Sequence, residues 1–337
     1  MPDPTRIDAA RDAVLLASLV CRQVQSNLSA IRQITKDDRS PVTIADYAAQ
    51  AIVATVLTER LGPILLVGEE SSTFLRQPEH RPHLEATLAA VQQLWSHWTE
   101  DDLLRAIDIG RGDAHHPAFW TLDPIDGTKG FLRNQQYAVC LAYIESGQPT
   151  IGAMGCPALP RDFGASVDAA DPRGCLYTAA RGDGVTEEYC TAADDAEGTD
   201  RTSLTRPMHE PDDPIMICAS VEEAHSDQSA TARVLAAINA EPEPLRLDSQ
   251  AKYAVVARGQ ADAYLRLPTR KGYVERIWDH AAGAVVAQEC GCTVSDIHGK
   301  PLDFSKGEGL ESNTGIVVAT PRAHGEIIAA IKALDVS

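Results

Sequence analysis

Residues 123–131 read Asp123-Pro124-Ile125-Asp126-Gly127-Thr128-Lys129-Gly130-Phe131. Two carboxylates lie three residues apart, and the proline between them fixes its own φ and has no N–H to donate. Mg²⁺ takes oxygen ligands and usually binds one or two carboxylates, completing its shell with water and substrate phosphate. The backbone carbonyl of Ile125 is a further candidate ligand. The stretch therefore predicts a short, stiff loop that holds two divalent cations beside a phosphate.

The residues that follow the two acids fit the same hypothesis. Gly127 lets the backbone approach a ligand closely, and Thr128 offers a hydroxyl group beside the metals. If a helix starts here, its backbone N–H groups are additional donors for a phosphate. An ordinary Asx-type turn is the alternative, because Asp, Pro and Gly are common turn residues.

Bulk properties restrict the class of protein. With 337 residues, one large domain or two closely packed domains are expected. A formal net charge of −18 argues against nucleic acid or an anionic membrane as partner, whereas bound divalent cations can invert the local field of an acidic site. The N-terminus lacks the basic and apolar regions of a signal peptide, and no apolar run approaches the roughly 20 residues that span a bilayer. We therefore expect a cytoplasmic protein.

The eight cysteines lack the spacing of a metal or redox site. The closest pair, Cys290 and Cys292, is separated by one glycine. Free and mostly buried thiols in a reducing compartment are the expectation.

Apolar periodicity outlines an α/β chain. Helical spacing predicts helices over residues 7–31 and 44–61, with a loop at 36–43 and Asp46 in the first turn of the second helix. A buried strand at 64–67 delivers Glu69 and Glu70 at its end, and a strand at 119–122 leads into the acidic stretch. A hairpin is predicted at 136–154 and a surface excursion at 182–214. Further strands (215–219, 263–267 and 315–319) alternate with helices (226–239, 279–289 and 321–334).

Four acidic elements that lie far apart in the sequence are candidates for one site. They are Asp46, Glu69, the Asp123–Asp126 pair, and Asp279 within WDHAAG at 278–283. Asp279 stands where a helix begins, so its carboxylate caps that helix or faces a cation.

Taken together, these motifs resemble the lithium-sensitive, Mg²⁺-dependent phosphatase superfamily of inositol monophosphatase. The superfamily's signals are GEES at 68–71, the 123–128 run and WDHAAG at 278–283. Within it, the chain is similar to the 3'(2'),5'-bisphosphate nucleotidase branch through SPVT at 40–43, DYAAQ at 46–50, KGFLR at 129–133, LDSQAKY at 247–253 and YLRLP at 264–268. Residues 133–137 and 115–118 depart from that branch, which bears on substrate identity rather than on the metal ligands.

The resemblance implies a fold and a set of roles. The fold is a layered αβαβα sandwich, here divided into an α+β domain at 1–165 with most metal ligands and an α/β domain at 166–337 with Asp279 and the nucleotide pocket. Asp46 and Thr128 activate the attacking water, and two or three Mg²⁺ ions are bound. The implied metal ligands are Glu69, Asp123, Asp126, Asp279 and the carbonyl of Ile125, with Glu70 supporting a third cation. The implied substrate contacts are Gly127, Thr128, Asp248, Ser249, Lys252 and Arg266, with His225 near the base.

The implied reaction is hydrolysis of the 3'-phosphate of 3'-phosphoadenosine 5'-phosphate to AMP and phosphate, by direct attack of water. 3'-Phosphoadenosine 5'-phosphosulfate is a further candidate substrate, which places the enzyme in sulfur metabolism. An inositol phosphate phosphatase with the same metal site is the nearest alternative, and a catalytically silent nucleotide sensor is another. The expected partner is this small molecule alone. The sequence does not fix the oligomeric state, and a monomer is the working expectation.

Overall fold

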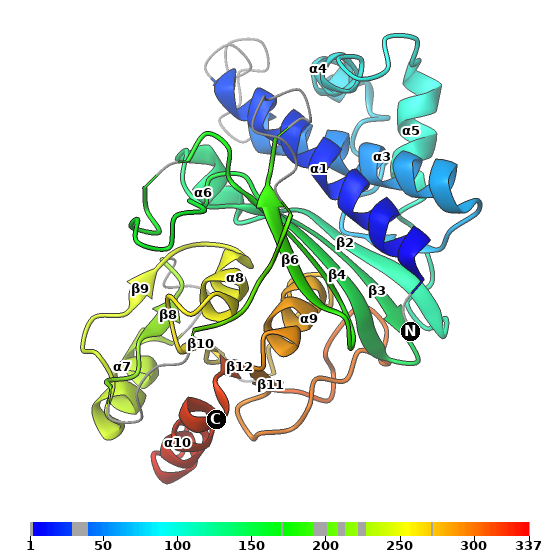
Figure 1. Ribbon diagram of the computed structural model, residues 1–337. Coiled ribbons are helices and arrows are strands. Elements are labelled where there is room, and N and C mark those ends of the chain that lie inside the picture. Colours follow the sequence, from blue (N-terminus) through cyan, green and yellow to red (C-terminus); the bar gives the residue numbers. More distant parts are fainter. Residues whose placement is uncertain are drawn as a thin grey trace.

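The computed structural model of the chain describes residues 3–28, 40–169, 171–191, 201–207, 213–221, 227–270 and 272–336. Helices and sheets alternate in layers through the molecule (Figure 1). The first layer is helical and contains α1 (Pro4–Ser26), α3 (Ser40–Leu61), η1 (Pro78–His80), α4 (Arg81–Val91) and α5 (Glu100–Asp108).

A seven-stranded sheet forms the second layer, with the strands in sequence order from β1 to β7. Strand β1 runs parallel to β2, and the remaining neighbours are antiparallel. The strands are β1 (Leu66–Gly68), β2 (Ala118–Asp126), β3 (Ala138–Glu145), β4 (Gln148–Cys156), β5 (Cys175–Ala180), β6 (Gly184–Tyr189) and β7 (Thr202–Ser203).

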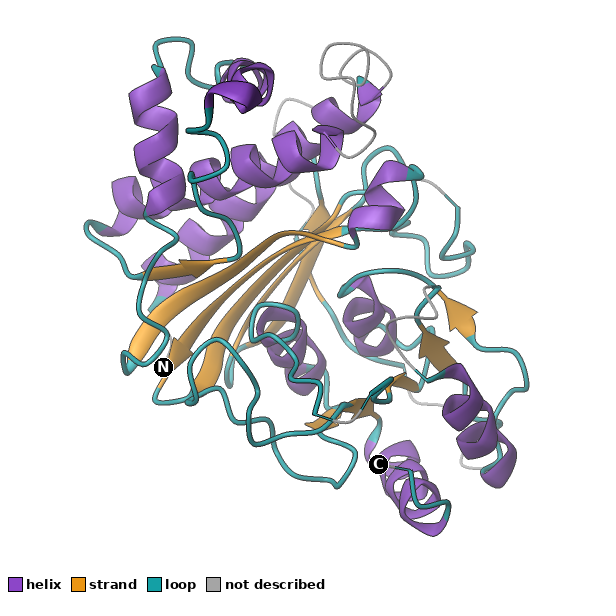
Figure 2. Ribbon diagram, turned by 180° about the vertical axis from the view of Figure 1, so that it is seen from behind, coloured by secondary structure: helices purple, strands orange, loops and turns teal. Residues whose placement is uncertain are grey.

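Helices cover this sheet on both faces (Figure 2). Strand β3 shows the consequence, because both of its faces are buried and its sequence is almost entirely apolar. Val139 and Leu141 join the core under α1 and α3, whereas Ala138, Cys140 and Ala142 face the opposite core. Side chains on the second face are small, and α9 packs against it there.

The C-terminal part of the chain completes the layers. Helices α8 (Ala251–Ala257) and α9 (Ala281–Glu289) lie between the large sheet and a five-stranded sheet of order β11-β12-β10-β8-β9. Helices α7 (Gln228–Ala237) and α10 (Pro321–Ala333) cover its outer face. The strands of this sheet are β8 (Ile217–Ala219), β9 (Leu245–Arg246), β10 (Ala263–Arg266), β11 (Thr293–Ser295) and β12 (Ile316–Ala319). The predicted αβαβα sandwich is therefore confirmed.

Most predicted elements are present with shifted ends. The hairpin prediction is confirmed by β3 and β4, whose turn places Ser146 and Gly147 at positive φ. The strands and helices predicted beyond residue 215 correspond to β8, β10, β12, α7, α9 and α10. Residues 29–39, and with them half of the predicted loop at 36–43, lie outside the described residues.

Three predictions need correction. Helix α3 already begins at Ser40, because Pro41 is tolerated in a first helical turn, so Asp46 lies in the second turn. The acidic stretch does not leave the sheet at Leu122, since β2 continues to Asp126 and β3 still pairs with both acids. Strand β6 lies within the region predicted as a surface excursion.

Two further observations concern the whole chain. All eight cysteines are free, and all but Cys290 are buried, as predicted. Within the described residues, no helix combines the length and the apolar character that a membrane span needs. The domain division at residue 165 stays a prediction; the chain passes from one sheet to the other between Ser203 and Ile217.

Candidate active site

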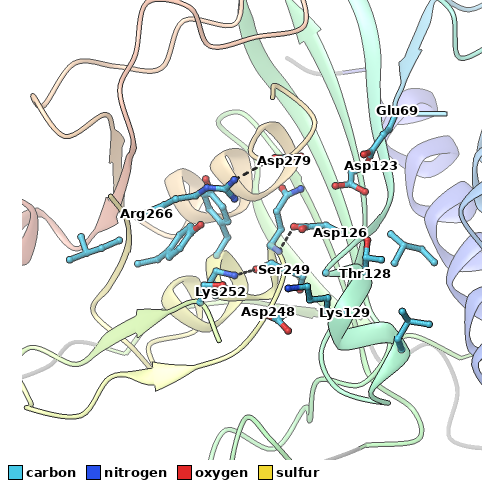
Figure 3. Close-up of a pocket in the computed structure, with 18 of the residues that line it drawn as sticks. Glu69, Asp123, Asp126, Thr128, Lys129, Asp248, Ser249, Lys252, Arg266 and Asp279 are labelled. Carbon is cyan, nitrogen blue, oxygen red and sulfur yellow. Dashed lines mark hydrogen bonds and ion pairs between the residues drawn. The ribbon is translucent and has the colours of Figure 1, made fainter. Parts of the chain in front are cut away.

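A cavity of about 420 Å³ opens where β1 and β2 end beside α8, β10 and the start of α9. Side chains from both halves of the chain project into it and face one another (Figure 3). Eleven of the predicted site residues line this cavity: Glu69, Asp123, Ile125, Asp126, Gly127, Thr128, Asp248, Ser249, Lys252, Arg266 and Asp279.

The first wall carries acids because two parallel strands end together. Gly68 pairs with Leu122, so the next residues along the two strands are Glu69 and Asp123. Figure 3 shows these two carboxylates side by side. Asp123 is buried, and its Oδ1 atom has no hydrogen-bond partner among the described residues. Such an orphaned acceptor is costly unless a ligand satisfies it.

The end of β2 turns the second acid of the motif toward α8. The pairing with β3 shifts register between Asp123 and Asp126, where Pro124 cannot donate to the ladder. Asp126 Oδ2 accepts a hydrogen bond of 2.5 Å from the backbone N–H of Gln250, just before α8. The motif thus joins the two halves of the site.

The opposite wall carries an acid beside a cation. Asp279 Oδ2 lies 3.8 Å from Arg266 Nη2, and the guanidinium group is held by Glu275 through contacts of 2.9 and 2.8 Å. His280 is the N-cap residue of α9, and its side chain makes no capping hydrogen bond. Asp279 therefore does not serve as the N-cap, which removes one of the two roles predicted for it.

Basic and polar groups of the predicted nucleotide pocket lie around the start of α8. Lys252 is buried, and its Nζ donates to the carbonyl groups of Ser249 (2.7 Å) and Leu247 (3.3 Å). An ammonium group has three donors, so one remains for a ligand. Asp248 Oδ2 accepts from Arg133 at 2.6 Å, while its buried Oδ1 has no partner in the described part of the chain.

The electrostatics follow from burial and from like charges. Burial, followed by the charges of Glu69 and Asp126, raises the pKa of Asp123 well above its ordinary value. Burial also raises the pKa of Asp279 to about 6, although His280 and Arg266 oppose the shift. Desolvation and the charge of Asp279 raise the pKa of Glu69 to about 8. Glu69 keeps exposed surface, so water screens part of this effect.

Asp46 and Glu70 are not among the residues that line the cavity. Burial and the charges of Glu70 and Glu69 raise the pKa of Asp46 well above its ordinary value. The charge of Asp46 in turn raises the pKa of Asp123. The acids therefore form one electrostatic group. Asp46 and Thr128 are both described, and no hydrogen bond joins them, so their pairing stays a prediction. His225 lies outside the described residues.

A compact group formed by Glu275, Asp279 and His280 is explained without a metal. Their potential ligand atoms all lie within 4.8 Å of one another. However, His280 Nδ1 contacts the Tyr253 hydroxyl at 2.8 Å, and Nε2 contacts Glu275 at 3.3 Å. One tautomer satisfies both contacts, with Tyr253 donating to Nδ1 and Nε2–H donating to the carboxylate. Both ring nitrogens are therefore in use.

Several residues at the site were missed in the sequence. Lys129 and Tyr273 line the cavity, and Glu275 orients Arg266. Lys129 could have been found from its place inside the acidic motif. Glu275 gives no signal in one sequence, because its contact with Arg266 of strand β10 is formed only in the folded chain.

The acids of the first wall, together with Asp279, fit a hard divalent cation. They supply only oxygen donors, which Mg²⁺ prefers, and one of those oxygens is the buried, unpartnered Oδ1 of Asp123. Their mutual repulsion is the kind that a bound cation relieves.

Comparison with known proteins agrees with this geometry. Residues 5–335 match the model of the inositol monophosphatase family. The chain is 39% identical to a 3'(2'),5'-bisphosphate nucleotidase of Schizosaccharomyces pombe, covering 97% of this chain and 94% of the relative. It is 38% identical to 3',5'-bisphosphate nucleotidase 2 of Arabidopsis thaliana, covering 96% and 95%.

Solved structures show the same fold at low sequence identity. Mycobacterium tuberculosis SuhB superimposes with a TM-score of 0.62 at 20% identity, covering 100% of this chain and 99% of that one. CysQ from Bacteroides thetaiotaomicron gives 0.60 at 23% identity, covering 94% and 97%. Because the family model matches residues 5–335, nearly the whole chain, the chain belongs to the inositol monophosphatase family.

Proposed function

We propose that this chain is a Mg²⁺-dependent 3'(2'),5'-bisphosphate nucleotidase. It removes the 3'-phosphate of 3'-phosphoadenosine 5'-phosphate to give AMP and phosphate, and it also accepts 3'-phosphoadenosine 5'-phosphosulfate. The observation that carries the proposal is the two-sided cavity, which sets Glu69, Asp123 and Asp126 opposite Asp279, Lys252 and Arg266. Relatives that bear the nucleotidase name share 35–39% identity with nearly the whole chain.

The acids of the cavity would hold two Mg²⁺ ions, with Glu70 supporting a third. The ligands are Glu69, Asp123, Asp126, Asp279 and the carbonyl of Ile125. When bound, Mg²⁺ supplies Lewis-acid activation of water and of the phosphoryl group.

Two side chains are assigned to the attacking water. Thr128 is exposed at the start of α6 (Thr128–Leu132), where its hydroxyl oxygen orients the water. Asp46 accepts the hydroxyl proton once the bound cations have offset the burial and the charges of Glu70 and Glu69 that raise its pKa in the metal-free chain. Hydrogen bonds of this kind often tighten only when substrate is present.

The basic residues are assigned to the rest of the nucleotide. Lys252 and Arg266 neutralise the second phosphate, and Ser249 offers a hydroxyl beside them. Burial lowers the pKa of Lys252, while the charges of Asp126 and Asp248 oppose this shift and favour the ammonium form. Asp248 presents its unpartnered oxygen to a donor of the nucleoside, and His225 is assigned to the base.

The decisive measurement compares two phosphate esters at saturating Mg²⁺. We expect kcat/KM for 3'-phosphoadenosine 5'-phosphate to exceed that for inositol 1,4-bisphosphate by at least 100-fold, on the order of 3 kcal/mol of discrimination. Faster cleavage of the inositol ester would instead identify an inositol phosphate phosphatase. Binding of the nucleotide without phosphate release would identify a silent sensor.

Removal of the metal by a chelator and competition by Li⁺ provide the accompanying controls. Activity should vanish in excess chelator and return with Mg²⁺, and Li⁺ should inhibit. Full activity in the presence of chelator contradicts the proposal.

A further inference from the structure

Two buried glutamines form hydrogen bonds between the segments that carry the acids. Gln50 ends the DYAAQ motif, Gln250 lies within LDSQAKY, and neither has a role in the proposed chemistry. Their exposed fractions are 0% and 1%. A buried side-chain amide is costly unless its donors and acceptor are satisfied, so their hydrogen bonds show what they hold.

Gln50 ties the helix of one acid to the turn of two others. Its Nε2 donates to the carbonyl groups of Glu70 (2.6 Å) and Ile107 (2.9 Å), and the Glu70 N–H donates to its Oε1 at 3.0 Å. Asp46 lies four residues earlier on the same face of α3. Gln50 therefore fixes the position of Asp46 relative to Glu69 and Glu70.

The turn after β1 depends on this contact. Strand β1 ends at Gly68, so Glu69 and Glu70 lie beyond the paired part of the sheet. Two glycines make room for the amide: a Cβ atom on Gly68 would lie 2.3 Å from Gln50 Oε1, and one on Gly110 would lie 2.4 Å from Nε2. The glycine of the GEES motif is thus explained by close approach.

Gln250 connects the two walls of the cavity. Its backbone N–H donates to Asp126, its Nε2 donates to the Trp278 carbonyl at 2.8 Å, and its Oε1 accepts from the Gly283 N–H at 3.0 Å. Trp278 directly precedes Asp279. One residue therefore links Asp126 of the first wall to the segment that carries Asp279 of the second.

We propose that Gln50 and Gln250 are positioning residues that hold the carboxylates of the site at the separations needed to bind divalent cations. The carboxylates carry like charges and repel one another, so the segments that bear them must be restrained. An amide satisfies backbone donors and acceptors without adding charge to an acidic cluster. This inference rests on the proposed metal site and identifies what sets its geometry.

The test replaces each glutamine by methionine, which keeps the length of the side chain and removes its hydrogen bonds. Partners that orient metal ligands typically change metal affinity 10- to 100-fold when they are removed. We expect Q50M and Q250M to raise the Mg²⁺ concentration for half-maximal activity by that factor. Isothermal titration calorimetry with Mg²⁺ alone should show the same loss of affinity, whereas KM for the nucleotide at saturating Mg²⁺ should change less than threefold.

Gln136 provides a matched control. It is buried, and its side chain donates to the carbonyl groups of Ala158 (3.0 Å) and Val167 (2.8 Å), neither of which belongs to a segment that carries a candidate metal ligand. Q136M should lower the unfolding temperature without changing Mg²⁺ affinity. If Q50M does not fold, G110A displaces the same amide by steric contact, and it should weaken Mg²⁺ binding in the same direction.

Each outcome has one interpretation. Equal Mg²⁺ affinity in the wild type, Q50M and Q250M overturns the inference, as does a loss that follows the unfolding temperature across all three methionine variants. A wild-type chain that binds Mg²⁺ but leaves 3'-phosphoadenosine 5'-phosphate intact refutes the proposed function alone. A wild-type chain that binds no Mg²⁺ refutes both.

Discussion

At the scale of single residues, Asp123 and Asp262 are two buried carboxylates that differ in their partners. Asp262 is paired with Arg206 at 2.9 Å and also accepts from the Met216 N–H. Within the described residues, Asp123 has no ion-pair partner and its Oδ1 has no hydrogen-bond partner, while the charges of four other acids act on it. The first carboxylate stabilises the fold, whereas the second is a cost that a ligand must offset.

This contrast predicts a gain of stability together with a loss of activity in D123N. Removing one of the repelling charges should stabilise the metal-free protein at pH 8 by about 1 kcal/mol. The same change should lower kcat by on the order of 10³-fold, because a metal ligand is lost. Urea unfolding in the presence of chelator and steady-state kinetics with Mg²⁺ measure the two effects.

D262N is the control for this variant. It leaves Arg206 without its charged partner, so it should destabilise the protein and leave kcat within about twofold of the wild type. A D123N protein that is less stable than the wild type in chelator would show that Asp123 stabilises the fold.

At the scale of elements, the turn from β2 to α6 requires Gly127. Its φ of +90° is in the left-handed region, and a Cβ atom there would lie 2.9 Å from Ser249 Cβ. G127A should therefore cost roughly 1–2 kcal/mol in backbone strain and also push Ser249 and the start of α8 away from Asp126. We expect kcat to fall roughly 10- to 100-fold, measured alongside the unfolding temperature.

G182A separates the two effects. Gly182 has a φ of +79°, and a Cβ atom there would have no neighbour within 4 Å. G182A should therefore show the same backbone strain as G127A, with unchanged kcat. If both variants lose activity equally, crowding against Ser249 is not the cause.

Elements with local signals could be predicted from the sequence, and those held by distant partners could not. Apolar periodicity is sufficient for α1 and α3, and the Ser146-Gly147 turn for the β3–β4 hairpin. Strand β6 was missed because its buried Glu187 and Glu188 look like surface residues. Their partners include Arg258 and Arg11, which lie in other parts of the sequence.

The same distinction applies to the site. The acids could be predicted because the oxygen ligands that a hard cation needs are visible in the residue types themselves. The role of Gln50 could not be predicted, because its partners are backbone groups 20 and 57 residues away. Every residue has a backbone carbonyl group, so the residue type of the acceptor does not reveal such a hydrogen bond.

At the scale of the whole molecule, the acid cluster makes stability depend on pH and on metal. The pKa of Asp279 is raised from 3.8 to about 6, and that of Glu69 from 4.5 to about 8. The metal-free folded state therefore binds protons more tightly than the unfolded state does. The stability that the folded state gains from binding these protons is fully present below about pH 4, and it is lost as pH rises through 6 to 8.

Mg²⁺ should reverse that loss, because it binds the deprotonated carboxylates. At pH 8, Mg²⁺ at about 100 times its Kd should stabilise the fold by roughly 2.7 kcal/mol. At pH 5, the same concentration should have little effect, because protons occupy the site. Thermal unfolding at both pH values, with chelator and with Mg²⁺, makes the comparison. Equal stabilisation at the two pH values would place Mg²⁺ binding outside this cluster.

The order of strands in the second sheet has a consequence for synthesis on the ribosome. Strand β12 lies between β11 and β10, and Arg266 at the end of β10 pairs with Ile316 of β12. A nascent chain that stops before Ile316 has made every proposed metal ligand but lacks the strand that aligns the cationic wall. The large sheet can assemble during translation, whereas the complete cavity has to wait for one of the last strands to be made.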